Sequence, residues 1–171
     1  EDGSAVAPLQ NITLSDVDST KLSWAKVTIS QGTLAAGDVL QLLAGTQLPA
    51  GVKVSYASGV LTIEGSATLA QYQQILRSVQ YTSTSQNPSE LARQISVQVA
   101  DEAGATSTYV STSVNVVAVN DAPQWVSAPA AVAAVEKQDL SLSASLSAQG
   151  MQIADVDAGN AVMTLTASVV N

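Results

Sequence analysis

Apolar and polar residues alternate along several stretches of this 171-residue chain, as they do in strands with one buried and one exposed face. The clearest case is the series Ile95, Val97 and Val99, in which every second residue is apolar. The long run 106–119 is rich in Thr and Val, which is typical of a terminal strand. The pattern therefore predicts a protein in which β-strands dominate.

Two further stretches favour strands and their connections. Residues 22–30 are rich in strand formers, but the apolar face shifts between Trp24 and Val27, which predicts a β-bulge. Residues 52–56 and 60–64 flank a short Ala-Ser-Gly segment, and this arrangement predicts a β-hairpin.

One segment has helical spacing instead. Its apolar residues recur three or four positions apart: Leu69, Tyr72, Ile75, Leu76 and Val79. Ser66 or Thr68 is placed to cap such a helix, so we expect a short helix over residues 67–77. An apolar stripe at this spacing indicates packing against a core rather than a ligand groove.

Composition limits the class of partner. Hydrophobic residues make up 46% of the chain, which is enough for a core, although that core must form without Phe. Only 12% of residues are charged, against about 25% in an average soluble domain, and Ser, Thr and Gln supply the surface. The formal net charge is −8 with six basic residues, which argues against nucleic acid and against anionic membranes as partners.

The residue types that are missing exclude several kinds of site. The chain has no His and no Cys, so Ser-His-Asp and Cys-His nucleophilic sites, Cys/His zinc sites and disulfides are ruled out. No stretch approaches the roughly 18 apolar residues of a membrane span, so membrane insertion is not expected. A structural metal can stabilise such a chain in place of disulfides.

An internal repeat carries the strongest signal. Asp16-Val17-Asp18 recurs as Asp155-Val156-Asp157, and the surrounding residues also align, with Trp24 against Met163. A full second copy would extend well beyond Asn171. We therefore expect one complete module followed by the opening half of another, as part of a longer array.

Hard oxygen ligands occur at the expected junction. Asn120 and Asp121 stand just before Pro123, and the Asp155 and Asp157 pair follows in the second copy. Calcium takes six to eight oxygens from carboxylates, carbonyls and water, so an acid-amide pair facing an Asp-x-Asp turn suits Ca²⁺. The alternative is an ordinary polar linker with a turn-forming Asn-Asp and a Pro stop.

Together these motifs resemble a known family. They are, in order, Glu-Asp-Gly (1–3), Asp-x-Asp (16–18), Val-x-Val-Ala-Asp-x-x-Gly (97–104) and Val-Asn-Asp-Ala-Pro-x-Trp (119–125). This order resembles the cadherin repeat, in particular the cadherin-like modules of large bacterial surface adhesins of the RTX type. The resemblance covers the first module and the first half of the second.

The resemblance implies an all-β fold. Residues 1–119 would form a cadherin-like or immunoglobulin-like Greek-key β-sandwich of seven strands with one short helix. Residues 120–124 would be a calcium-binding linker, and residues 125–171 would be the N-terminal part of a second, incomplete repeat.

The resemblance also implies two metal sites. The junction below the first module would be built from Glu1, Asp2, Asn120, Asp121, Asp155 and Asp157. The top of the module would be built from Asp16, Asp18 and Asp101, and this upper site should bind weakly or not at all without a preceding linker. Asp101 and Glu102 could instead form an ordinary acidic turn between strands.

The chain departs from the cadherin pattern in ways that reduce ligand charge. Ala118 occupies the first acidic position of the linker, and one asparagine is missing before Ala122 and Pro123. Lys137 replaces the acid equivalent to Asp2. Because affinity follows charge count and rigidity, we expect one or two ions at each junction rather than three.

The expected function is structural. The chain would be a Ca²⁺-rigidified extender module of an extracellular, bacterial cell-surface adhesin, without catalytic activity, and would contribute to adhesion or biofilm formation. Its partners would be neighbouring repeats of the same chain, and another copy could complete the half module by strand exchange. The alternative is a carbohydrate- or protein-binding module, with Trp24 and Trp125 as platforms.

Overall fold

The computed structural model describes residues 3–127, 136–137, 152–163 and 166. The chain divides into two compact units, Glu1–Val119 and Asn120–Asn171, and each is described by itself. We call them the first and the second unit. Glu1 and Asp2, which the resemblance to the cadherin repeat would place in the junction site, lie outside the described residues.

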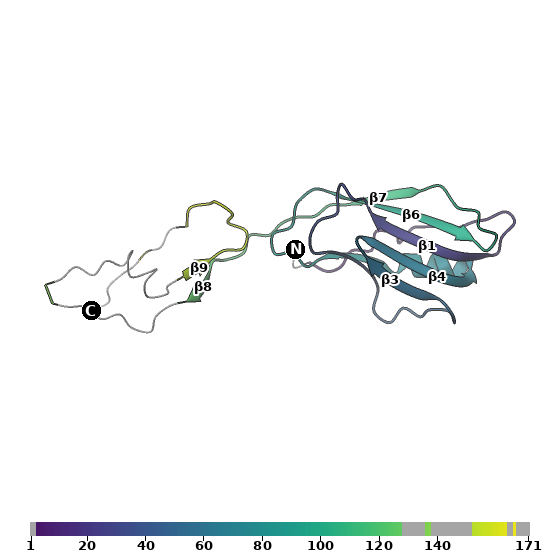
Figure 1. Cartoon of the computed structure of the whole chain (residues 1–171), viewed down its shortest axis with the longest axis horizontal. Helices are drawn as coiled ribbons and strands as arrows, with labels where there is room; N and C mark the ends of the chain where they lie inside the picture. Colours follow the sequence, from purple (N-terminus) through teal and green to yellow (C-terminus); the bar gives the residue numbers. More distant parts are fainter. Residues whose placement is uncertain (1–2, 128–135, 138–151, 164–165, 167–171) are drawn as a thin grey trace. The chain divides into compact units, whose positions relative to one another are not determined.

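The first unit is built on a five-stranded antiparallel sheet in which strands distant in sequence lie side by side (Figure 1). Across the sheet, the strands are β3 (Lys53–Ala57), β4 (Val60–Thr68), β1 (Lys21–Ile29), β6 (Arg93–Asp101) and β7 (Val110–Val114). β1 is central, and β3 and β7 are the two edges.

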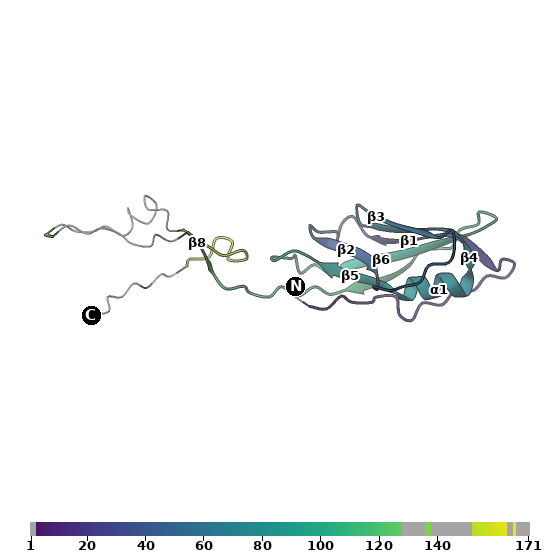
Figure 2. The ribbon, with the colours of Figure 1, turned by 90° about the horizontal axis from the view of Figure 1, so that it is seen from below.

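A second, smaller sheet pairs β2 (Asp38–Leu42) with β5 (Val79–Ser83), which Figure 2 shows next to each other. Val6 joins this sheet through two backbone hydrogen bonds with Tyr81, of 2.9 and 2.7 Å. The apolar faces of the two sheets share one core, so the fold is an all-β sandwich with one short helix, as predicted.

The predicted bulge in the first strand is confirmed. The pairing of β1 with both of its neighbours shifts register between Leu22 and Trp24. Beyond the bulge, Ala25, Val27 and Ile29 are fully buried, while the alternate residues face outward. The bulge therefore allows Leu22 to remain in the core although it lies an odd number of residues before Ala25.

The predicted hairpin is β3–β4. Its two turn residues, Ser58 and Gly59, both have positive φ, 48° and 82°. This is the signature of a tight turn whose twist matches the twist of the strands. A Cβ at position 59 would also lie 2.9 Å from the side chain of Leu34, which would have to shift to make room for it.

The predicted helix is α1 (Leu69–Arg77). Thr68 caps it through a capping box with Gln71, which identifies Thr68 rather than Ser66 as the cap. Tyr72, Ile75 and Leu76 form its buried face, so the stripe packs on the core as expected. None of the described residues forms a helix long and apolar enough to cross a membrane.

The terminal strand is shorter than predicted. The run 106–119 forms a strand only over β7, and before β7 it makes only isolated contacts with the end of β6. There the N–H of Ser107 donates to the carbonyl of Val99 at 2.9 Å, and Thr106 makes an isolated bridge with Ala100.

The described part of the second unit contains one strand pair. β8 (Gln124–Ser127) pairs antiparallel with β9 (Gln152–Ala154). Trp125, on β8, has 53% of its surface exposed. The half module predicted for residues 125–171 falls largely on residues outside those described.

Candidate metal centre

The first Asp-x-Asp motif forms a compact turn just before β1. One carboxylate oxygen of Asp16 accepts hydrogen bonds from the backbone N–H groups of Asp18, at 3.1 Å, and of Ser19, at 2.9 Å. Val17, between the two acids, is fully exposed. The turn therefore holds the two acidic side chains while its apex faces solvent.

Asp101 lies at the end of β6 and is held by hydrogen bonds at several points. Its Oδ1 accepts from the backbone N–H of Ala105 at 2.8 Å, and its Oδ2 accepts from the hydroxyl of Ser19 at 3.0 Å. The hydroxyl of Ser23 donates to its backbone carbonyl at 2.6 Å. Only 5% of Asp101 is exposed, so this carboxylate is fixed in place before any ligand arrives.

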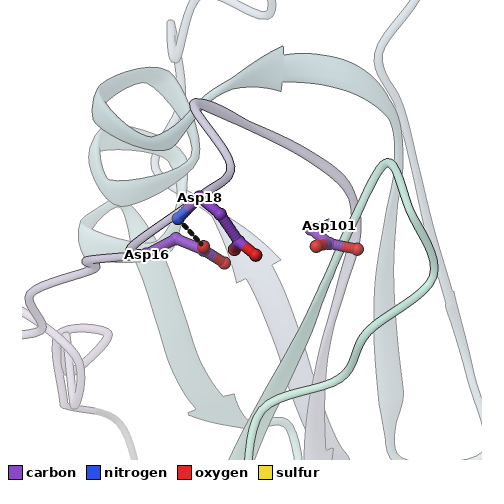
Figure 3. A group of neighbouring side chains, drawn as sticks. All are labelled: Asp16, Asp18 and Asp101. Atoms are coloured by element: carbon purple, nitrogen blue, oxygen red, sulfur yellow. Dashed lines mark hydrogen bonds between the residues drawn. The ribbon is translucent and has the colours of Figure 1, made fainter.

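The three carboxylates converge at one end of the sandwich (Figure 3). One oxygen from each of Asp16, Asp18 and Asp101 lies within 4.8 Å of the others. The predicted grouping of these residues is therefore present. The cluster could hold a metal ion, because three carboxylates supply the hard oxygen ligands that such ions take.

The electrostatics of the cluster favour a cation. Within the described residues, the ion pairs found are Asp38 with Arg93 and Glu136 with Lys137, so no basic side chain pairs with the cluster. The N–H groups of Ser19 and Asp18 stabilise the charged form of Asp16 and hold its pKa below the usual value of 3.8. The site therefore keeps negative charge that the protein itself does not neutralise.

The second Asp-x-Asp motif forms the same turn. Asp155 Oδ1 accepts from the backbone N–H groups of Asp157, at 3.3 Å, and Ala158, at 3.0 Å. These donors stand at the same two positions, two and three residues on, as in the first copy. The repeat read from the sequence is therefore also a repeat of local hydrogen bonding.

The predicted linker ligands approach this second turn. The backbone N–H of Asp121 donates to Asp157 Oδ2 at 2.9 Å, and the side-chain amide of Asn120 donates to the carbonyl of Asp121 at 2.8 Å. The Asp155 side chain and then the Asp121 N–H lower the pKa of Asp157 below its usual value. Within the described residues, the acids of the second unit do not form a three-carboxylate group like that of the first.

Some residues of the centre were not predicted. Ser19 and Ser23 fix Asp101 through their hydroxyls, and only the position of Ser19 directly after the Asp-x-Asp motif hinted at a role. The exposed Glu102, next to Asp101, accepts a short hydrogen bond from the hydroxyl of Ser66 and is not part of the cluster.

Comparison of the chain with family models, with curated proteins and with solved structures finds no match. The functional interpretation therefore depends on the residues and their geometry. The resemblance to the cadherin repeat stays a prediction.

Proposed function

We propose that the first unit is a structural module stabilised by Ca²⁺ bound to Asp16, Asp18 and Asp101. The observation that carries the proposal is the convergence of these three carboxylates, from a loop and from a strand end, with no basic partner among the described residues. Like charges this close repel one another, and a bound cation offsets that repulsion. Binding therefore stabilises the folded arrangement of the loop on the end of β6.

The chemistry of the ligands favours Ca²⁺ over other ions. All three ligands are carboxylates, and the chain has no His or Cys to attract zinc. Three carboxylates cannot fill the six to eight positions of Ca²⁺ alone unless several bind through both oxygens, so water completes the shell. We expect weak binding, with a dissociation constant on the order of 10⁻⁴ to 10⁻³ M, as in extracellular modules.

The wider role follows from the repeat. The same turn stands in both units, and the residues before the second turn carry the acid-amide pair Asn120 and Asp121. We propose an extender module of an extracellular bacterial adhesin, arrayed with neighbouring repeats and stiffened by Ca²⁺ for adhesion or biofilm formation. The order of acidic motifs that resembles the cadherin repeat supports this role.

A binding module is the second candidate. Trp125 is half exposed on β8, and the ring of Trp24 lies under Lys26, with Nζ 5.1 Å from the ring centroid. Exposed aromatic rings suit stacking on sugars or on a protein partner. Binding of a glycan or protein that is lost in Trp125→Ala and persists in chelator would favour this candidate.

Thermal unfolding with Ca²⁺, Mg²⁺ or chelator tests the metal proposal. A ligand that binds only the folded state adds about 2.7 kcal/mol at 100 times its dissociation constant. We expect Ca²⁺ to raise the melting temperature by several degrees, and millimolar Mg²⁺ to do so less, because Mg²⁺ demands tight octahedral geometry. Asp101→Asn should remove the Ca²⁺-induced shift.

Glu102→Gln is the matched control, because it removes the same charge from the neighbouring position outside the cluster. This variant should keep the full Ca²⁺-induced shift. Identical melts of the unmodified protein in Ca²⁺ and in chelator would refute the metal proposal. Equal loss of the shift in both variants would reduce it to charge screening.

A further inference from the structure

The two edges of the large sheet differ in how they are protected. Edge strands expose unpaired backbone groups, and proteins commonly guard them with Lys, Pro or short irregular segments. β3 begins with the exposed Lys53, and Pro49 and Gly51 precede it. β7 lies within residues 105–119, which contain no charged residue, no Pro and no Gly. Only β7 therefore lacks the usual protection.

The backbone groups that β7 turns outward can be identified from the pairing. The N–H of Ser30 donates to the carbonyl of Gln94 at 2.8 Å, so Gln94 faces the β1 side of β6. Successive residues of a strand direct these groups to opposite sides, and Ile95 therefore faces β7, where it pairs with Thr112. Ser111 and Ser113 consequently direct their N–H and carbonyl groups away from the sheet.

This outer edge is open. Ser111 and Ser113 are both exposed, and within the described residues their outward backbone groups have no hydrogen-bond partner. The N-terminal segment 7–12 runs nearby, separated from β7 by a hollow of about 300 Å³. That hollow is lined from β7 by Val110 and Thr112, whose partners in β6 are buried, so the segment lies on the inner side.

We propose that the β7 edge pairs antiparallel with the β7 edge of a second copy of this chain. The strand reads Val-Ser-Thr-Ser-Val over residues 110–114, which is the same in both directions. A two-fold axis at Thr112 places Thr112 opposite itself, Val110 opposite Val114 and Ser111 opposite Ser113. Every residue thus pairs with a residue of the same type, which suits an interface between identical surfaces.

The pairing satisfies the open groups without an electrostatic penalty. Ser111 and Ser113 form the hydrogen-bonded pairs across the axis, and Thr112 forms a close pair without backbone hydrogen bonds. No charge faces a like charge in the paired strands, although the whole chain carries −8. The contact of two five-residue strands is smaller than a standard stable interface, so the dimer is weak and depends on concentration.

Single cysteines test the register, since the chain has none of its own. In the proposed dimer the two Thr112 Cα atoms are about 4.5 Å apart, within the range that a disulfide spans. The two Ser113 Cα atoms are displaced by two residues and lie about 8 Å apart, which is too far. Under mild oxidation of the full chain, Thr112→Cys should form the disulfide dimer and Ser113→Cys should form severalfold less.

A charge placed on the edge tests whether unmodified chains associate in the same way. In sedimentation experiments the average mass should rise with concentration. Ser111→Lys should abolish that rise, and it should also abolish the Thr112→Cys dimer. Ser55→Lys, at an exposed position on the β3 edge, is the matched control and should leave both unchanged.

Two kinds of result would overturn the dimer proposal. A monomer at all concentrations, or equal disulfide yields from Thr112→Cys and Ser113→Cys, overturns the proposal. A mass increase that persists in Ser111→Lys also overturns it and assigns the association to another surface, such as strand exchange through the second unit. Equal melting temperatures of the Lys variants and the unmodified chain exclude misfolding as the cause.

Discussion

The two ends of strand β6 differ in the charged groups that surround an acidic side chain. At its first residue, Arg93 is fully buried and its Nε donates to Asp38 Oδ2 at 2.7 Å. At its last residue, Asp101 faces two further carboxylates, Asp16 and Asp18. One end pairs its carboxylate with the guanidinium of Arg93, and the other end gathers three carboxylates with no cationic partner in the part of the chain that the structure describes.

The difference in hydrogen bonding is equally clear. Asp38 also accepts from the hydroxyl of Tyr81, at 2.6 Å, and from the N–H of Ala35, at 2.7 Å, so its charge is fully satisfied inside the fold. Burial and the neighbouring Asp38 carboxylate raise the pKa of Tyr81, which keeps its hydroxyl a donor. The Arg93 end is a permanent internal brace. The Asp101 end could hold an ion from solution, and under the proposed function its stability should depend on that ion.

The largest effect is expected at the Arg93 end. Asp38→Ala leaves Arg93 buried without its counter-charge, and breaking a buried pair in this way costs about 3–5 kcal/mol. The free energy of unfolding, measured by denaturant titration in chelator, should fall by that amount. The loss should be the same in Ca²⁺, because the pair is independent of the cluster.

A double replacement provides the control. Asp38→Leu combined with Arg93→Met removes both charges, and such exchanges are often neutral or stabilising. It should restore most of the stability that Asp38→Ala removes. If Asp38→Ala alone costs less than about 1 kcal/mol, the charge at this end is solvated and the contrast between the two ends fails.

The next effect concerns the two copies of the Asp-x-Asp turn. Asp16→Asn and Asp155→Asn each keep the oxygen that accepts the turn hydrogen bonds and remove only the charge. Asp16→Asn should lose the Ca²⁺-induced stabilisation of the first unit, worth up to about 2.7 kcal/mol at 100 times the dissociation constant. Asp155→Asn should keep it. Circular dichroism melts with and without Ca²⁺ give the comparison.

The reverse result would relocate the site. If Asp155→Asn abolishes the Ca²⁺ response and Asp16→Asn does not, the stabilising ion binds in the second unit, among the predicted ligands Asn120, Asp121 and Asp157. The three-carboxylate cluster of the first unit would then be only a repelling group.

Local signals in the sequence predicted the local parts of the fold. Alternation identified β6, the shift of the apolar face at Trp24 identified the bulge, and helical spacing after Thr68 identified α1. The Asp16, Asp18 and Asp101 grouping was also predicted, because the order of acidic motifs resembles one in which these positions meet. Each of these features depends on residues that are close in sequence or on a recognisable motif.

The buried ion pair was missed for a physical reason. Asp38 and Arg93 are separated by 55 positions and each occupies the buried row of its strand, where the alternation rule expects an apolar residue. A charge at such a position interrupts the apolar alternation by which a strand is predicted, and β2 was not predicted. Only the tertiary contact makes either charge acceptable in the core.

A smaller effect is expected inside the core, at Tyr72. Its hydroxyl donates to the carbonyl of Gly65 at 2.6 Å, and Tyr72→Phe should cost about 1 kcal/mol of unfolding free energy at neutral pH. Burial, followed by the charge of Glu64, raises the pKa of Tyr72 to about 12 from 10.0. The folded state thus holds this proton more tightly than the unfolded state.

The sign of the pH effect follows from that shift. The proton on Tyr72 contributes stability that is complete below pH 10.0 and is lost as the pH rises to about 12. Tyr72→Phe should therefore flatten part of the alkaline decline in the melting temperature. An unchanged decline in the variant would assign it to the other tyrosines.

The smallest effect distinguishes the two turns by their titration in chelator. The N–H groups of Ser19 and Asp18 lower the pKa of Asp16, and the Asp155 side chain with the N–H of Asp121 lowers that of Asp157. A carboxylate with a lowered pKa contributes stability above its unfolded value of 3.8, and the contribution is lost as the pH falls through the lower, folded value. Because both side chains are near solvent, the change in melting temperature between pH 5 and 2 should be slight.

Carboxyl-carbon NMR titration should give both residues a pKa below 3.8. Asp121→Ala keeps the backbone N–H, so the pKa of Asp157 should stay low in this variant. If the pKa of Asp16 is low and that of Asp157 is not, the contacts from Asp155 and Asp121 do not stabilise the charged form of Asp157. The two copies then differ in chemistry as well as in the number of carboxylates they bring together.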